Sequence, residues 1–314
     1  MLRIGSRGSK LALEQAGWVK SRLEERFKEL QVSLTKIKTT GDMILDVPLA
    51  QVGGKGLFVK EIEEALLRQA IDLAVHSMKD VPTLLHSGLH LGAITDREDP
   101  RDVFMSKDGR PLKELRQKAR IGTSSLRRQA QLLHLRPDLE VVQLRGNLDT
   151  RIRKLSQEGL DGIILAAAGL KRMGWLDRIT EYLPFEVSLP AVGQGALGIE
   201  CRVVDEATNQ KLEFLNHPVT HCCVLAERAF LRRLEGGCQV PIAAHGRLEN
   251  GSIRLEGLVS SVDGRRLIRD DMEGPMGEAE ELGIRLADRL ISNGAEAILK
   301  EIYSKAGNKQ TGDQ

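Results

Sequence analysis

Residues 2–27, LRIGSRGSKLALEQAGWVKSRLEERF, predict a short buried strand that leads directly into an amphipathic helix. The strand is the apolar run Leu2–Gly5. Apolar residues then recur every three or four positions, at Leu13, Ala16, Val19, Leu23 and Phe27. That spacing places them on one face of an α-helix. A strand followed at once by a helix is the repeating unit of sheets that are covered by helices.

The same alternation continues through the first two-thirds of the chain and predicts an α/β fold. Further helices are expected at 59–69 and 125–135. Further strands are expected at 32–39, 71–75, 89–94, 141–144 and 163–167, and around Ile121.

The pattern changes after Asn216, where a helix at 219–234 precedes a group of three strands. Asn250-Gly251 and Asp263-Gly264 separate the strands, and such pairs favour tight hairpin turns. The strands are expected at 243–248, 252–260 and 266–272, and two more helices at 279–292 and 295–303. This part is therefore expected to be an α+β domain with a three-stranded antiparallel sheet.

Two stretches are expected to carry the chain between two α/β domains. Residues 96–101, DREDPR, are charged and contain a proline, and a second crossover is expected near 189–195. The polar end from Lys305 onwards has nothing to bury and is expected to be disordered. The domain boundaries that follow are 1–95 with 196–213 for the first domain, 101–189 for the second and 218–309 for the third, with a disordered tail at 310–314.

Composition excludes several classes of protein. The 314 residues are 41% hydrophobic and 29% charged, which is typical of a globular protein. No apolar run approaches the roughly 20 residues that span a bilayer, and the N-terminus lacks the apolar region of a signal peptide, so we expect a cytosolic protein without a membrane partner. Four cysteines in a chain of this length predict no disulfide framework.

Arginine dominates the basic residues, with 29 arginines against 17 lysines, although the net charge is only +2. Its planar guanidinium suits carboxylates and phosphates. Ten aromatic residues are few for a protein that stacks on single-stranded nucleic acid, so no nucleic-acid partner is expected.

The first candidate site is the stretch 122–128, GTSSLRR, which follows a short strand and opens a helix. Hydroxyls, free backbone N–H groups and two guanidinium groups would meet there and could bind an anion. The alternative is an ordinary serine N-cap with solvated arginines. Arg145, Arg151 and Arg172 also lie near strand-to-helix junctions, and together these arginines predict a cleft for several carboxylates or phosphates.

Two glycine-rich stretches resemble nucleotide-binding motifs without matching them. In Gly53–Gly56 the residue after Lys55 is glycine, where a phosphate-binding loop needs Ser or Thr, so we interpret it as a mobile loop over the cleft. Gly193–Gly198 has the glycine spacing of a dinucleotide fingerprint but does not follow a clear strand, so NAD is not expected.

Two further segments carry reactive side chains. In 76–82, HSMKDVP, Lys79 and Asp80 end a strand; they are either a solvated pair or a carboxylate among cations that could stabilise a cationic intermediate. In 235–241, EGGCQVP, Cys238 is either an exposed thiol for covalent chemistry or a buried, inert cysteine. His217, His221, Cys222 and Cys223 do not have zinc spacing, and no metal is expected.

With these motifs in view, the chain resembles the porphobilinogen deaminase (hydroxymethylbilane synthase) family over about residues 3–303. The motifs that carry the resemblance are HSMKDVP, GTSSLRR, LRGN, LPAVGQGALGIECR and LEGGCQVPI. The resemblance implies a monomer of three domains. Two of them have the fold of type II periplasmic binding proteins and face each other across a cleft, and the third holds a cofactor cysteine on a loop.

The resemblance also implies an activity. Four porphobilinogen molecules, the small-molecule substrate, would be condensed onto a dipyrromethane primer attached to Cys238 through a thioether. Each addition releases ammonia, and hydrolysis then frees hydroxymethylbilane for tetrapyrrole biosynthesis. Asp80 would bind pyrrole N–H groups and stabilise the azafulvene that forms when ammonia leaves.

The resemblance assigns the other site residues to three groups. The catalytic residues beside Asp80 would be Lys79, Arg7, Arg145, Arg151 and Arg172. Cofactor contacts beside Asp80 and Lys79 would come from Ser77, Thr123, Ser124, Ser125, Arg127, Arg128, Arg145 and Gly146. Substrate contacts would come from Arg7, Ser9, Lys55, Arg145, Arg151, Arg172 and Gln194.

Two departures and one rival interpretation remain. Gln51 stands where related bacterial enzymes often have lysine, and the segment around Ser9 differs from the commoner Thr-Arg-x-Ser-Pro. The rival is a non-catalytic protein that binds anions in the same cleft. It accounts for the arginines but leaves Cys238 and Asp80 without a role.

Overall fold

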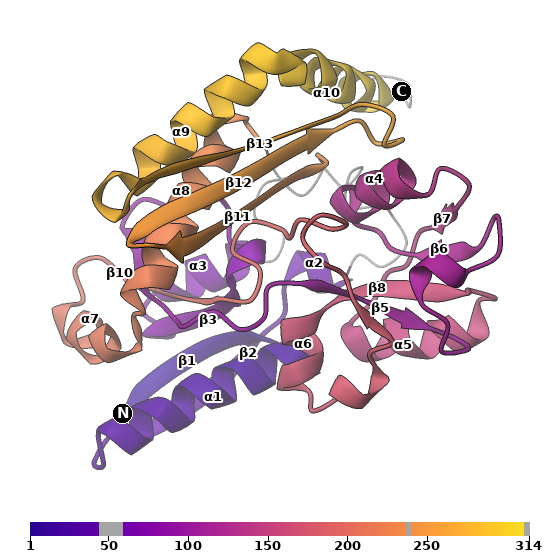
Figure 1. Cartoon of the computed structure of the whole chain (residues 1–314). Helices are drawn as coiled ribbons and strands as arrows, with labels where there is room; N and C mark the ends of the chain where they lie inside the picture. The colour runs from indigo at the N-terminus through magenta and orange to yellow at the C-terminus, as the bar shows by residue number, and fades with distance from the viewer. Residues whose placement is uncertain (44–58, 237–239, 311–314) are drawn as a thin grey trace.

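The computed structural model describes residues 1–43, 59–236 and 240–310, and it contains three sheets (Figure 1). The first sheet has the order β2-β1-β3-β10-β4. Its strands β1, β2 and β3 are parallel, and β10 is antiparallel to both of its neighbours. The strands are β1 (Leu2–Arg7), β2 (Val32–Ile37), β3 (Leu73–Ser77), β4 (Leu89–Ile94) and β10 (Leu197–Arg202).

The second sheet, β7-β6-β8-β5-β9, repeats this plan with β5 as its antiparallel strand. The chain reaches β5 directly from β4 of the first sheet, and it returns from β9 to β10, so each antiparallel strand is the first strand that the chain forms after crossing from one sheet to the other. Residues 95–101 and 183–196 make these two connections, and Glu98 N donates to Gly195 O between them at 3.3 Å. The strands are β5 (Asp102–Ser106), β6 (Arg120–Gly122), β7 (Glu140–Val142), β8 (Gly162–Ala166) and β9 (Glu181–Tyr182).

Helices cover the two sheets as the apolar spacing predicted. Ala16, Val19 and Leu23 of α1 (Lys10–Arg26) are fully buried and pack in one cluster with Leu2 and Ile4 of β1. The other helices of these two domains are α2 (Thr40–Met43), α3 (Lys60–Leu67), α4 (Leu126–Leu135), α5 (Leu148–Gln157), α6 (Ala167–Arg172) and α7 (Glu206–Leu212).

The C-terminal part forms the third sheet, β11-β12-β13, which is antiparallel and lies with its helices at the top of Figure 1. The predicted Asn250-Gly251 turn connects the first two strands, and both residues have the positive φ angles (50° and 84°) that such a hairpin turn requires. The elements are α8 (Pro218–Arg233), β11 (Ile242–Glu249), β12 (Ser252–Ser260), β13 (Leu267–Pro275), α9 (Ala279–Leu290) and α10 (Glu296–Gln310).

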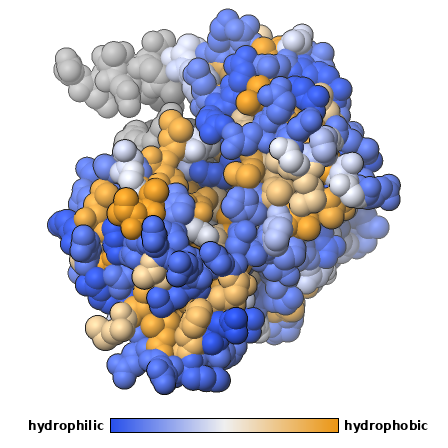
Figure 2. Space-filling model, turned by 90° about the vertical axis from the view of Figure 1, so that its left-hand side faces the viewer, coloured by the Kyte–Doolittle hydropathy of each residue, from blue (hydrophilic) through white to orange (hydrophobic). Residues whose placement is uncertain are grey.

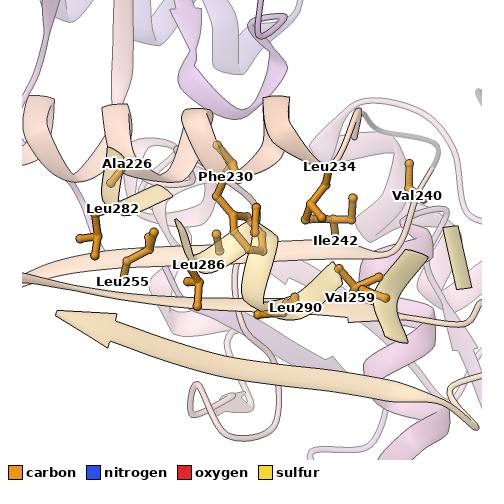
Figure 3. Close-up of a cluster of buried hydrophobic side chains, with 14 of the residues drawn as sticks. Ala226, Phe230, Leu234, Val240, Ile242, Leu255, Val259, Leu282, Leu286 and Leu290 are labelled. Carbon is orange, nitrogen blue, oxygen red and sulfur yellow. The ribbon is translucent and has the colours of Figure 1, made fainter. Parts of the chain in front are cut away.

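A core of its own supports this third part. Figure 3 shows Phe230 of α8 between the strands and α9, beside Leu286. Both side chains are fully buried. The α/β and α+β parts of the expected fold class are thereby confirmed: the first two domains are each built on a five-stranded mixed sheet with helices, and the C-terminal α+β domain has a three-stranded antiparallel sheet.

Some elements differ from the expectation. The strand β5 was not anticipated, and α10 continues to Gln310, so the expectation of disorder from Lys305 onwards is wrong as far as Gln310. No helix in the described ranges is long and apolar enough to cross a membrane. The face in Figure 2 is covered mostly by hydrophilic residues, with apolar residues in scattered groups.

Candidate functional site

A cavity of about 710 Å³ lies between the first two domains. The C-terminal ends of β1, β3 and β8, the N-terminal ends of α1 and α5, and the second connection all contribute to its wall. Among the described residues that line it, two are carboxylates, Asp80 and Asp149. Eight are cations: Arg7, Lys10, Lys38, Lys79, Arg128, Arg145, Arg151 and Arg172.

Asp80 lies in a single helical turn, Met78–Asp80, directly after β3. Its side chain is 37% exposed, and its Oδ2 lies 3.9 Å from Nη1 of Arg7 at the end of β1. These two residues meet because β1 and β3 are adjacent parallel strands whose C-terminal ends share one edge of the sheet. The structure thus brings the predicted carboxylate and its cation together inside the cavity.

Lys79 precedes Asp80 and faces the same cavity. Its Nζ lies 3.3 Å from Oε1 of Gln194, which accepts a hydrogen bond from it. Burial lowers the pKa of Lys79 to about 8, and Arg128 adds to that effect, while Asp80 and Asp102 oppose it. Near neutral pH the side chain is therefore an ammonium group that is less firmly protonated than an exposed lysine.

The GTSSLRR stretch contains the serine N-cap of the alternative interpretation, but its two arginines are not solvated. Ser125 caps α4, since its hydroxyl accepts from Arg128 N at 3.4 Å. Arg127 and Arg128 are buried and both bind Asp102, at 2.7 Å each. Arg128 lines the cavity; Arg127 does not. The Asp102 carboxylate therefore already pairs with both guanidinium groups, which leaves fewer of their N–H donors for a ligand.

The hydroxyl groups next to the two arginines differ in their access to the cavity. Ser124 lines it and donates to Leu144 O at 2.8 Å. Thr123 and Ser125 are not part of the wall, and Thr123 Oγ1 instead accepts from Ser125 N at 3.2 Å. Thr123 and Ser125 thus support the turn that holds Arg128.

The remaining predicted arginines, Arg145, Arg151 and Arg172, also line the cavity. Arg151 Nε donates to Gly146 O at 2.8 Å, and Arg172 Nη2 donates to Gly195 O at 2.6 Å. Burial lowers the pKa of each guanidinium to about 10; Arg128 adds to the effect at Arg151, whereas Glu98 opposes it at Arg172. Arg145 and Gly146 line the wall beside them, and Gly146 has a φ of 112°, which few other residues adopt.

Ser9 and Ser77 also line the cavity, and each has a structural partner. Ser9 is the N-cap of α1 and accepts from Ala12 N at 3.2 Å. Ser77 accepts from Nε2 of Gln15 at 3.0 Å. The hydroxyl of Ser9 therefore belongs both to the helix and to the cavity wall.

Several lining residues were not anticipated from the sequence. Gln15, Lys10 and Lys38 are in the wall, as is Asp149 in the first turn of α5. Lys38 could have been found, because it follows β2, the parallel neighbour of β1. Of the predicted site residues, Lys55 and Cys238 lie outside the described residues, and so does Gln51.

The charges of the cavity fit a ligand with several carboxylates. Among the described lining residues, eight cations against two carboxylates leave a strong positive excess, and charge-assisted hydrogen bonds to carboxylates are strong. A group made of linked pyrroles with acidic side chains has this chemistry, and a carboxylate such as Asp80 can accept from its pyrrole N–H groups.

Comparison with known proteins agrees with this geometry. The family model described as "Porphobilinogen deaminase, dipyromethane cofactor binding domain" matches residues 2–210, and "Porphobilinogen deaminase, C-terminal domain" matches residues 221–292.

Porphobilinogen deaminase of Pelobacter propionicus is 62% identical over 304 residues, which cover 97% of this chain and 98% of that protein. Porphobilinogen deaminase of Geobacter sulfurreducens is 60% identical over 309 residues, 98% of this chain and 97% of that protein. Among solved structures, the periplasmic aliphatic sulphonate binding protein SsuA from Escherichia coli is 15% identical with a TM-score of 0.40, covering 74% of this chain and 70% of that chain. The chain belongs to the porphobilinogen deaminase family.

Proposed function

We propose that this protein is a hydroxymethylbilane synthase, a transferase that condenses four porphobilinogen molecules head to tail and releases linear hydroxymethylbilane for tetrapyrrole biosynthesis. The observation that carries the proposal is the cavity, in which cations from both α/β domains surround Asp80. Each porphobilinogen brings two carboxylates, and guanidinium groups bind carboxylates in a bidentate manner.

Asp80 is the catalytic group in this proposal. Its carboxylate accepts from the pyrrole N–H of the substrate and stabilises the positive charge that develops when ammonia leaves. Arg7, whose Nη1 lies 3.9 Å from Oδ2 of Asp80, orients the carboxylate. Lys79, next to Asp80, supplies an ammonium group at the same end of the cavity.

The other lining cations hold the acidic side chains of the pyrroles. Arg128, Arg145 and Arg151 contribute from the second domain, and Arg172 contributes from the end of α6 beside the second connection. Ser9, Ser77, Ser124 and Gln194 add neutral hydrogen-bonding groups to the same wall. Arg127, Thr123 and Ser125 act on the ligand only through Arg128 and the turn that holds it.

The dipyrromethane cofactor fits the cavity, because its four carboxylates match the cationic excess. Cys238 would hold it through a thioether, and Lys55 would add a cation from the glycine-rich segment. When bound, the cofactor supplies the nucleophilic carbon to which the first substrate is joined.

We infer that the three domains comprise 1–95 with 196–213, 101–189, and 218–309, since each of the three sheets draws its strands from one of these sets. We also propose a cytoplasmic monomer without a nucleic-acid partner. The scarcity of aromatic residues supports the last point.

The intact mass of the purified protein tests the proposal. We expect an excess equal to two linked pyrrole units, absent in Cys238→Ser and retained in Cys222→Ser, whose thiol lies half-buried on α8. We also expect the wild-type protein to consume porphobilinogen with release of ammonia. If the polypeptide mass stays unmodified after incubation with porphobilinogen, and small anions bind reversibly, the non-catalytic anion-binding protein is the correct interpretation.

A further inference from the structure

A buried carboxylate behind the cavity wall has no role in the function proposed above. Asp102, the first residue of β5, is completely buried and does not line the cavity. It accepts hydrogen bonds from four side chains, Arg127, Arg128, Ser188 and Gln194. Two of these four, Arg128 and Gln194, line the cavity.

The two carboxylate oxygens of Asp102 accept hydrogen bonds from different partners. Oδ2 accepts from Arg127 Nη1 at 2.7 Å and from Ser188 Oγ at 2.8 Å, and neither of these residues lines the cavity. Oδ1 accepts from Arg128 Nε and Nη2, at 3.1 and 2.7 Å, and from Gln194 Nε2 at 2.9 Å. Oδ1 therefore accepts from both of the partners that line the cavity, Arg128 and Gln194.

These contacts determine the orientation of the Gln194 amide. Both hydrogens of its Nε2 are used, one on Asp102 Oδ1 and one on Pro100 O at 2.7 Å. The reversed amide would place its oxygen against two acceptors, which is unfavourable. Gln194 Oε1 must consequently point the other way, where it accepts from Lys79 Nζ at 3.3 Å.

We propose that Asp102 is a positioning residue. It fixes the Arg128 guanidinium directly and the Lys79 ammonium group through Gln194. Both cations are thereby oriented to bind the carboxylates of the pyrroles. This inference rests on the proposed function for its ligand, but its geometry concerns only residues of this chain. Asp102 supplies one negative charge to Arg127 and Arg128, so the wall keeps a net positive charge.

The test needs a readout that does not depend on turnover. We would measure the pH at which Lys79 becomes half-reactive toward acetic anhydride, by mass spectrometry of the peptide that contains it. The charged groups that act on Lys79 are Asp80 and Asp102, which favour the ammonium form, and Arg127 and Arg128, which disfavour it. In the wild-type protein we expect a midpoint near the Lys79 pKa of about 8.

Gln194→Met removes the acceptor of Lys79 while leaving both arginines paired with Asp102. We expect the midpoint to fall by about half a pH unit or more, because the ammonium form loses a hydrogen bond. Asp102→Asn should lower it in the same direction, and the double variant should shift it by less than the sum of the two. Ser188→Ala, which removes a partner of the same carboxylate on Oδ2, should leave the midpoint unchanged.

A KM measurement on the holoenzyme completes the test. A role in positioning the binding cations predicts that Asp102→Asn raises KM for porphobilinogen by about tenfold or more, with a smaller fall in kcat of the folded fraction. A role in stability alone would reduce the amount of folded enzyme without changing its KM. If Asp102→Asn does not fold, Gln194→Met decides the question.

An unchanged Lys79 midpoint in folded Gln194→Met or Asp102→Asn overturns the inference. If instead the wild-type protein does not turn over porphobilinogen, the proposed function is wrong. The titration of Lys79 does not depend on turnover, so it still tests the role of Asp102.

Discussion

Asp80 is the residue whose removal should separate chemistry from folding most clearly. Its side chain is 37% exposed, and its ion pair with Arg7 is long, at 3.9 Å, so a change here should alter the free energy of unfolding by less than about 1 kcal/mol. The electrostatic stabilisation that it gives to a developing cation should be worth roughly 10²- to 10³-fold in rate. We therefore expect Asp80→Ala to fold and to lose about that much kcat, measured as hydroxymethylbilane formed per holoenzyme.

Asp149 provides the matched control, because it is the other carboxylate among the described residues of the cavity wall. Asp149→Ala should retain kcat within about threefold, since Asp149 lies in the first turn of α5, where its charge mainly stabilises the N-terminus of that helix. Equal losses in both variants would mean that the negative charge of the cavity matters and that Asp80 has no special role.

Lys79 should make substrate binding depend on pH. Burial, with Arg128, lowers its pKa to about 8, so the side chain is charged below that pH and neutral above it. A substrate carboxylate binds the charged form, and kcat/KM reports ionisations of the free enzyme. We expect kcat/KM to fall as the pH rises through about 8, and Lys79→Arg to remove this alkaline limb because arginine stays charged. A limb that persists unchanged in Lys79→Arg would assign it to another group.

At the scale of single elements, Ser9 tests whether a helix cap can also bind the ligand. Its hydroxyl caps the 17-residue α1 and also belongs to the cavity wall. Ser9→Ala should lower the free energy of unfolding by about 1 kcal/mol, whereas Ser9→Gly should cost only a few tenths. Both variants lack the hydroxyl, so both should raise KM for porphobilinogen to a similar extent.

Urea unfolding of the two Ser9 variants and their KM values give the two measurements. A rise in KM that follows the loss of stability, large in Ser9→Ala and absent in Ser9→Gly, would show that the cap alone matters. The matched pair is useful because glycine replaces the cap at little cost.

The elements that could be predicted from the sequence are those whose signal is local. The apolar face of α1 follows from its spacing, and the hairpin between β11 and β12 follows from Asn250-Gly251. The strand β5, DVFMS, was missed because it is short and has no helical or alternating pattern. The crossing from β4 was expected at residues 96–101, but the place of β5 between β8 and β9 depends on long-range strand pairing that no local spacing encodes.

The same distinction applies to the candidate site. Lys79 and Asp80 could be singled out because they follow a strand within one short motif. The pairing of Arg127 and Arg128 with Asp102, 25 and 26 residues earlier in the chain, could not, since it depends on how β5 and α4 pack in three dimensions. In the folded protein, fewer N–H donors of Arg127 and Arg128 are therefore available to a ligand than the sequence alone suggested.

At the scale of the whole molecule, one buried carboxylate joins the third domain to both connections between the first two. Glu227 of α8 is fully buried, and its Oε1 lies 2.8 Å from Nη2 of Arg97 in the first connection. Its Oε2 accepts from Gly193 N of the second connection at 2.6 Å, and Oε1 also accepts from Gly246 N of β11 at 2.8 Å. Through these contacts the domain that contains Cys238 is attached to the segments between the two halves of the cavity.

Breaking this junction should destabilise the protein strongly, because removing one partner of a buried ion pair leaves the other charge buried without compensation. We expect Glu227→Gln to lower the free energy of unfolding by about 3–5 kcal/mol in urea titrations. Glu280→Gln is the control: Glu280 pairs with Arg232 at 3.1 Å between α9 and α8, but both side chains are exposed, so about 0–1 kcal/mol is expected. Replacing Arg97 and Glu227 together by methionine and leucine should cost less than the sum of the single changes, since no unpaired charge remains. A loss in Glu227→Gln no larger than that in Glu280→Gln would mean that the third domain is held to the connections by apolar packing alone.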